Sequence, residues 1–258
     1  KNYRTSCATQ YNQAVGKKTG VSLVDPNDIL AFSYYKAARD LKMPLKLRPI
    51  QRRGADYHDQ TISGEIASAS AIRQAALAGE DVAAVVPPQT AADLANLRVV
   101  PGWAALYPLL RNHLIQAPVG YLAQSYLMSE GLEYRMKAAA ERNLSFDGFL
   151  RAVKTKRYTY ARLLRVCLYT LLELDQEAVE RAMANPYLHV LAFNDRGRDY
   201  LHTVKKDLAY PLLTKVTADQ KEGLVNADYR AGKLYQTFTP VEQDVKHAPV
   251  IKLSRKNH

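Results

Sequence analysis

Two serines and an arginine, placed at the start of an apolar run, are the residues whose types and spacing most suggest chemistry. Ser68 and Ser70 lie where the run Ala71–Leu77 is expected to begin as a helix, and Arg73 follows within one turn. The free N–H groups of a helix start, its positive dipole end and a guanidinium all favour a bound anion. A serine before a helix is more often only a cap, so this pattern alone indicates a phosphate site weakly.

The segments before these serines predict where such a site would lie. We expect a helix over Ile29–Leu41, capped by Asn27 or Asp28, and a strand where apolar residues alternate over Leu45–Ile50. Helix, strand, loop and helix in succession indicate part of an α/β unit with a parallel sheet, in which ligands bind beyond the strand ends. Asn27 and Arg52 would then reach the serines from neighbouring segments of the same edge.

The loop before the serines contains a second group of polar side chains. Asp56, Tyr57, His58 and Asp59 follow one another directly. His58 could titrate near neutral pH between two carboxylates, so the loop could hold a metal or a general base. A lone histidine of this kind is more often structural, and we favour a loop held by local hydrogen bonds. We therefore expect no metal site in the chain.

The segment 151–165 indicates another kind of function, because its six basic residues are accompanied by no acidic one. On a single helix, four of the basic side chains would share one side and the leucines the other. Two interleaved tyrosines would serve as base-stacking platforms. A charge run is usually a solvated helix face, but the lack of acidic residues favours nucleic-acid binding. The residues expected to make these contacts are Lys154, Lys156, Arg157, Tyr158, Tyr160, Arg162 and Arg165.

The composition supports a polyanionic partner. The chain has 258 residues, 47% of them hydrophobic, with a formal net charge of +11 and a pI near 9.5, so we expect a packed core and a surface that attracts anions. A second basic cluster borders the expected phosphate site, which suggests a substrate long enough to span both patches. This cluster comprises Lys42, Lys46, Arg48, Arg52 and Arg53.

Cysteine usage and hydropathy favour a cytoplasmic protein. Cys7 and Cys167 lie far apart and fit neither a metal spacing nor a disulfide pattern. No apolar run approaches the roughly 20 residues of a membrane span, and no signal peptide is evident. The chain begins at Lys1 in a polar segment, and we expect that an N-terminal portion precedes it.

The fold class changes along the chain. We expect an α/β domain over residues 1–100, followed by a mostly α domain over residues 101–258 that ends in a small α+β part. Repeated amphipathic helices rich in leucine and alanine fill Leu106–Leu174, whereas Tyr187–Phe193 and Pro211–Val216 have strand-like patterns.

Several motifs in series resemble the bacterial tRNA(Met) cytidine acetate ligase family. Arg52 with Tyr57-His58-Asp59 lies between the first two of them, and His247-Ala248-Pro249 resembles the family's ending. The resemblance covers nearly the whole chain, and its serial order is more specific than any one motif. The longer motifs are Asp25-Pro26-Asn27-Asp28-Ile29-Leu30, Ala67-Ser68-Ala69-Ser70-Ala71-Ile72-Arg73 and Lys154-Thr155-Lys156-Arg157-Tyr158-Thr159-Tyr160-Ala161-Arg162-Leu163.

The resemblance implies an enzyme that uses ATP, with Mg²⁺, to activate acetate as acetyl-adenylate. The acetyl group then passes to N4 of the wobble cytidine of elongator tRNA(Met). The implied fold is part of a Rossmannoid nucleotidyltransferase-like domain followed by a helical, basic domain that binds tRNA. The residues implied to bind ATP are Asn27, Arg52, Arg53, Ser68, Ser70 and Arg73, with Arg73 also catalytic.

One departure from the family pattern limits this expectation. The family has a His-x-Gly-His motif that binds ATP, and the chain contains none. We therefore expect the chain by itself to have little or no ligase activity, and a homodimer through an exposed sheet edge to be possible. Two alternatives stay open: a non-catalytic RNA-binding module, or a nucleotidyltransferase-like enzyme that adenylates a small molecule.

Overall fold

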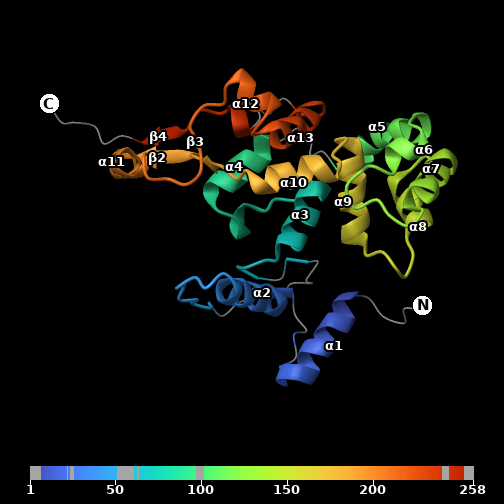
Figure 1. The fold of residues 1–258 in the computed structure, drawn as a ribbon, viewed down its shortest axis with the longest axis horizontal. Helices are drawn as coiled ribbons and strands as arrows, with labels where there is room; N and C mark the ends of the chain where they lie inside the picture. The colour runs from blue at the N-terminus through green and yellow to red at the C-terminus, as the bar shows by residue number, and fades with distance from the viewer. Residues whose placement is uncertain are drawn as a thin grey trace. The chain divides into compact units, whose positions relative to one another are not determined.

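The computed structural model describes residues 7–21, 23, 26–50, 61–62, 64–96, 102–239 and 244–252. The chain divides into two compact units, Lys1–Arg98 and Val99–His258, which we call unit 1 and unit 2. Figure 1 shows the course of the chain through both.

Unit 1 consists of helices in the part that the structure describes. Their bounds are α1 Cys7–Thr19, α2 Pro26–Asp40, α3 Ala69–Ala78, the single 3₁₀ turn η1 Ala83–Val85 and α4 Pro88–Asn96. Helix α3 packs through Ala71 and Ala75, which are both buried. Its C-terminal cap is Gly79, whose φ of 80° is left-handed and costs glycine little.

Two predictions for unit 1 are wrong. Helix α2 begins at Pro26, whose fixed φ suits a first helical turn, so Asn27 and Asp28 lie inside the helix and do not cap it. The segment Leu45–Ile50 is no strand; residues 43–50 have neither helical nor strand structure and all are exposed. Alternation alone cannot make a strand, because its backbone must pair with another, and no such partner is found among the described residues of unit 1.

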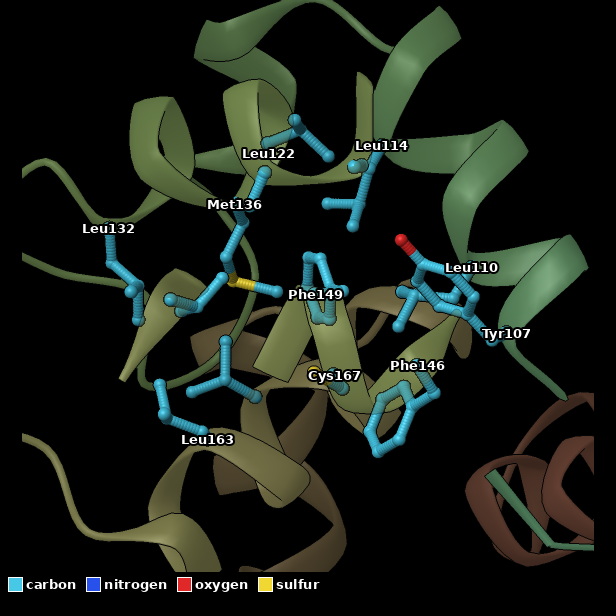
Figure 2. Close-up of a cluster of buried hydrophobic side chains, with 14 of the residues drawn as sticks. Tyr107, Leu110, Leu114, Leu122, Leu132, Met136, Phe146, Phe149, Leu163 and Cys167 are labelled. Atoms are coloured by element: carbon cyan, nitrogen blue, oxygen red, sulfur yellow. The ribbon is translucent and has the colours of Figure 1, made fainter. Parts of the chain in front are cut away.

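Unit 2 begins with a five-helix bundle around one apolar core. Tyr107, Leu110, Leu114, Met136 and Phe149 are at most 2% exposed and meet at its centre, as Figure 2 shows. Loss of contact with water on this scale is the main source of stability in such a bundle. The five helices are α5 Trp103–Gln116, α6 Val119–Leu122, α7 Leu132–Arg142, α8 Phe146–Val153 and α9 Tyr160–Leu171.

Side chains satisfy the ends of these helices. The Lys137 ammonium donates to the carbonyls of Leu114 (3.2 Å) and Ala117 (2.9 Å) at the end of α5. Arg111 Nε donates in return to the Ala140 carbonyl (2.9 Å) near the end of α7. Cations at helix C-termini oppose the negative dipole end and bind carbonyls that the helix leaves unpaired. These two bases therefore stabilise the bundle.

The rest of unit 2 contains short strands between helices, as predicted for its small α+β part. Strands β1 (Leu188–His189) and β3 (Leu212–Leu213) pair in parallel, as do β2 (Ala192–Asn194) and β4 (Val250–Lys252). The remaining elements are α10 Gln176–Ala184, α11 Asp195–Val204, α12 Ala218–Glu222, α13 Asn226–Gln236 and the 3₁₀ turn η2 Asp244–Lys246.

Candidate functional site

The start of α3 is a helix N-terminus capped by a serine side chain. Ser68 is 2% exposed, and its hydroxyl accepts the Ala71 N–H at 3.0 Å, so it caps the helix. Ser70 and Arg73, three residues apart, therefore lie on neighbouring positions of one face, and both are exposed. The two serines thus have different roles: Ser68 holds the helix start in place, and Ser70 and Arg73 remain on its surface.

The other residues predicted to bind the nucleotide are less completely placed. Asn27 lies exposed in the first turn of α2, also near a helix N-terminus. Arg52 and Arg53 lie outside the described residues, as does the group from Asp56 to Asp59. The structure describes Asn27, Ser68, Ser70 and Arg73, all of them in unit 1.

The basic segment is not one helix, so the prediction that its cations share a helix side is wrong. Helix α8 ends at Val153, and Lys154 is its C-cap. A linker follows, and α9 begins at Tyr160 with Thr159 as its N-cap, whose hydroxyl accepts the Arg162 N–H at 3.2 Å. Thr159 divides the segment into two parts, because the residue that caps the start of a helix has a non-helical backbone.

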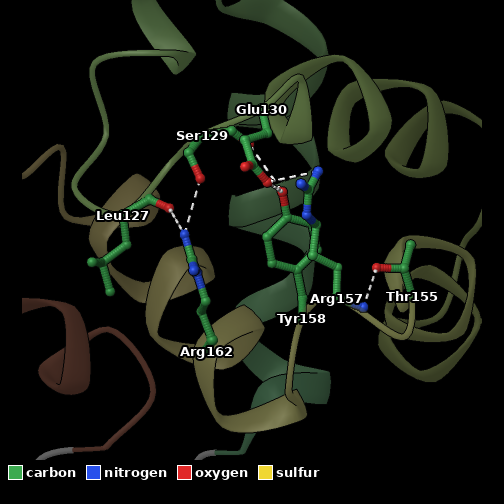
Figure 3. Close-up of polar contacts among 7 residues, drawn as sticks. All are labelled: Leu127, Ser129, Glu130, Thr155, Arg157, Tyr158 and Arg162. Carbon is green, nitrogen blue, oxygen red and sulfur yellow. Dashed lines mark hydrogen bonds and ion pairs between the residues drawn. The ribbon is translucent and has the colours of Figure 1, made fainter. Parts of the chain in front are cut away.

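Part of this segment points inward and holds a loop of unit 2, as Figure 3 shows. Tyr158 is 5% exposed, and its hydroxyl donates to the Ser129 carbonyl and lies 3.2 Å from a Glu130 carboxylate oxygen. Arg162 Nη2 donates to Ser129 Oγ at 2.9 Å and to the Leu127 carbonyl at 3.3 Å. The Arg162 guanidinium also lies over the Tyr158 ring, 5.1 Å from its centroid. Tyr158 therefore cannot serve as a base-stacking platform.

The exposed Arg157 of this segment is paired with an acid that lies far away in the sequence. Arg157 pairs with Glu130 at 2.9 Å. Burial, with the hydrogen bond to Glu130 as a further cause, raises the pKa of Tyr158 above its usual value. Leu127 and Glu130 have left-handed φ values of 65° and 60°, which cost energy for residues with side chains. The bonds from the segment stabilise this loop conformation.

The remainder of the segment faces outward. Lys156 and Arg165 are exposed, and Tyr160 is 51% exposed. The half-buried Lys154 places its ammonium 5.2 Å from the Tyr160 ring centroid. An exposed aromatic ring beside cations is the combination that binds bases and phosphates of single-stranded nucleic acid. We call these four residues the outward group. Arg157 is exposed as well, but it is paired with Glu130.

Several residues of this region could not be found from the sequence. Glu130 and Ser129 lie about thirty positions before the side chains they bind, and no local pattern connects them. Burial raises the pKa of the Cys167 thiol to about 12, so that thiol is an inert core group. Among the described residues, no three His, Cys, Asp or Glu side chains are grouped so that they could hold a metal ion. None of the helices that the structure describes is long and apolar enough to cross a membrane.

Comparison with known proteins places this fold in a class. A crystal structure of apo TmcAL from Thermotoga maritima matches with a TM-score of 0.80 at 23% identity, covering 96% of this chain and 66% of that one. A second, titled as bound with alpha-thio ATP, matches with a TM-score of 0.76 at 22% identity over 96% of this chain and 65% of that chain. The chain therefore shares the fold of the matched part of TmcAL.

The sequence comparisons are more specific. The family described as HIGH Nucleotidyl Transferase matches residues 1–248. The tRNA(Met) cytidine acetate ligase of Limosilactobacillus reuteri is 59% identical over 249 residues, which are 96% of this chain and 66% of that protein. The ligase of the same name from Limosilactobacillus fermentum is 50% identical over 248 residues, with the same coverage. The chain belongs to the HIGH nucleotidyltransferase family, and it spans 66% of the length of these curated relatives.

Proposed function

We propose that the chain serves an ATP-dependent ligase that acetylates N4 of the wobble cytidine of elongator tRNA(Met). The observation that carries this proposal is the 59% identity to a tRNA(Met) cytidine acetate ligase over 96% of the chain. The other ligase of that name supports the same reaction, and it favours a tRNA substrate over a small molecule. The outward group suits such a substrate, because it joins cations to an accessible ring.

The first half-reaction would join acetate to AMP at unit 1. A carboxylate oxygen of acetate attacks the α-phosphorus of ATP, a P–O bond forms, and the bond to pyrophosphate breaks. Arg73 and the N–H groups at the start of α3 suit the negative charge that accumulates on the leaving phosphates. Ser70 and Asn27 would orient the nucleotide, with Arg52 and Arg53 as further proposed ligands. Mg²⁺ would enter on the ATP phosphates and be held chiefly by substrate oxygens.

The second half-reaction would transfer the acetyl group to RNA. The cytidine N4 amine attacks the carbonyl carbon of acetyl-adenylate, the C–O bond to AMP breaks, and the amine loses one proton. The base must leave its stack to present this amine. Lys154, Lys156, Tyr160 and Arg165 would bind the RNA backbone and a base, which gives affinity more than sequence choice.

The test uses the chain joined to the part of the L. reuteri ligase that it does not match. We expect this protein to catalyse acetate-dependent ATP–pyrophosphate exchange and to incorporate radiolabelled acetate into elongator tRNA(Met). The variant R73A should lose exchange about 100-fold or more, because one preorganised donor to a developing charge contributes that much. R39A, which changes another exposed arginine of unit 1, is the matched control and should keep full exchange.

Two results would overturn parts of this proposal. Exchange that is supported by another carboxylic acid but not by acetate would show a different adenylating enzyme. Exchange with acetate but no label in tRNA(Met) would refute the RNA substrate. The 258-residue chain by itself should bind tRNA without turnover, since it contains no His-x-Gly-His sequence.

A further inference from the structure

A hollow beside α11 combines positive charge with an apolar lining. It has a volume of about 580 Å³, within the range of ligand-binding clefts. Arg198, His202, Lys205 and Lys206 line it from α11 and the residues that directly follow this helix. Among the described residues that line the hollow, none carries a carboxylate. An anion would therefore meet cations on this side without a facing negative charge.

The cations of the hollow differ in how far they are neutralised. Arg198 lies 3.5 Å from an Asp195 carboxylate oxygen and 3.3 Å from one of Asp199, so its charge is partly neutralised. Lys205 and Lys206 are exposed, and within the described ranges no ion pair to either ammonium is found. The two lysines therefore supply most of the attraction for an anion.

The rest of the lining is mostly apolar and comes from two strands and from α11. Phe193 of β2, Leu212 of β3 and Leu201 of α11 are half-buried and line the hollow, with Thr214 beside them. A partly exposed aromatic ring next to cations can stack on a base while the cations bind its phosphate. The Thr214 hydroxyl adds a group that can donate or accept one hydrogen bond.

A further lysine lies near the start of α11. Asn194 caps α11 and pairs in register with Lys252 of β4, so that lysine lies close to the helix start. Figure 1 shows α11 beside β2 and β4, at the opposite end of unit 2 from the bundle of α5 to α9. The outward group belongs to that bundle end, through α8 and α9. An RNA that contacts both surfaces must be extended over the length of unit 2.

We propose that the hollow beside α11 is a second RNA-binding surface, which takes a phosphodiester together with its nucleoside. This inference rests on the proposed tRNA substrate and adds a contact far from the outward group. An acidic protein would need the charge but not the half-buried Phe193 ring beside it, so this ring favours RNA. The surface would bind the body of the tRNA and hold it while another part reaches unit 1.

The test compares two pairs of adjacent lysines at helix C-termini. K205E/K206E alters the hollow, and K17E/K18E makes the same charge change in the last turn of α1, where both lysines are exposed. Binding of the 258-residue chain to an elongator tRNA(Met) transcript is followed by fluorescence anisotropy over a salt series. We expect K205E/K206E to weaken binding about tenfold or more and to reduce the salt slope by about two. K17E/K18E should change affinity less than threefold, and circular dichroism should show both variants folded.

Each other outcome has a definite meaning. Wild-type binding that K205E/K206E leaves unchanged, or weakens no more than K17E/K18E, overturns the hollow and leaves the proposed function standing. No tRNA binding by the wild-type chain overturns both the hollow and the proposed RNA substrate. Poly-L-glutamate that displaces tRNA from wild type as well as an RNA oligonucleotide of equal charge would show a general polyanion surface and refute the nucleoside contact.

Discussion

The inward and outward parts of the segment 154–165 have the same kinds of residues and opposite surroundings. Tyr158 is 5% exposed and bound to the loop that contains Ser129, whereas Tyr160, two positions later, is 51% exposed beside Lys154. Arg162 reaches two oxygen atoms of the same loop, whereas Arg165, one turn later, is exposed. Basic and aromatic composition is therefore insufficient to assign a nucleic-acid surface, because half of this signal holds the protein together.

The largest difference between the two parts should appear in stability. Y158A removes a buried ring and should lower the free energy of unfolding by about 3–5 kcal/mol. Y160A removes a ring that is half exposed and should change it by less than about 1 kcal/mol. Urea unfolding of both variants, followed by circular dichroism, measures the two values. Similar losses would show that the inward and outward tyrosines are not distinct.

A smaller difference in stability is expected between variants of Arg162 and Arg165. R162A leaves the Leu127 carbonyl and Ser129 without their donor and should cost about 2 kcal/mol of stability. R165A, an exposed arginine on the same helix, should stay within about 0.5 kcal/mol of wild type. The same unfolding measurement applies. A stable R162A variant that has lost tRNA affinity would instead assign Arg162 to the RNA surface.

The outward group should decide affinity for RNA with little effect on folding. K154A/K156A/R165A should weaken tRNA binding about tenfold or more and reduce the salt slope by up to about three. R157A is the control, since Arg157 is paired with Glu130, and its salt slope should fall by less than one. Anisotropy titrations from 50 to 300 mM salt test both. If R157A matches the triple variant, the Glu130 pair does not keep Arg157 from RNA.

The smallest effect concerns alkaline pH. The pKa of Tyr158 is raised in the folded state, so the unfolded chain loses this proton first, near pH 10. Stability contributed by the neutral hydroxyl is therefore present below pH 10 and is lost as the pH rises further. Y158F should show a shallower decline in Tm above pH 10 than wild type or Y160F. If Tm declines equally in wild type, Y158F and Y160F, the burial and hydrogen bonding assigned to the Tyr158 hydroxyl are wrong.

A local signal predicted the start of α3 well. Ser68 caps α3, as a serine before a helix commonly does, because a capping side chain acts on backbone groups within a few positions. The resemblance to the ligase family, read from motifs in series, is confirmed by the family comparison. Such signals depend on the order of residues along the chain, which the sequence contains in full.

Features that depend on residues far apart in the sequence were predicted wrongly or not at all. The strand expected over Leu45–Ile50 needed a partner strand that its own alternation cannot supply. The charge of Arg157 is balanced by Glu130 from outside the segment, which a count of local acids cannot detect. The hollow beside α11 is lined by residues from β2, β3 and α11. Three aspartates lie in or beside α11, so a count of charges along the sequence does not reveal the cations of the hollow. In all three cases the outcome depends on contacts between residues that are distant in the sequence.

Protease cleavage in the linker between α8 and α9 can report whether RNA is bound. The linker contains Lys154, Lys156 and Arg157, and trypsin cleaves the peptide bonds that follow lysine and arginine residues. It lies between two helices whose facing ends are capped. Cleavage there would leave both fragments associated, because Phe149 and Leu163 on either side are buried in one core. A bound RNA that covers the outward group would shield these bonds. The rate of nicking therefore reports occupancy of that surface without any label or substitution.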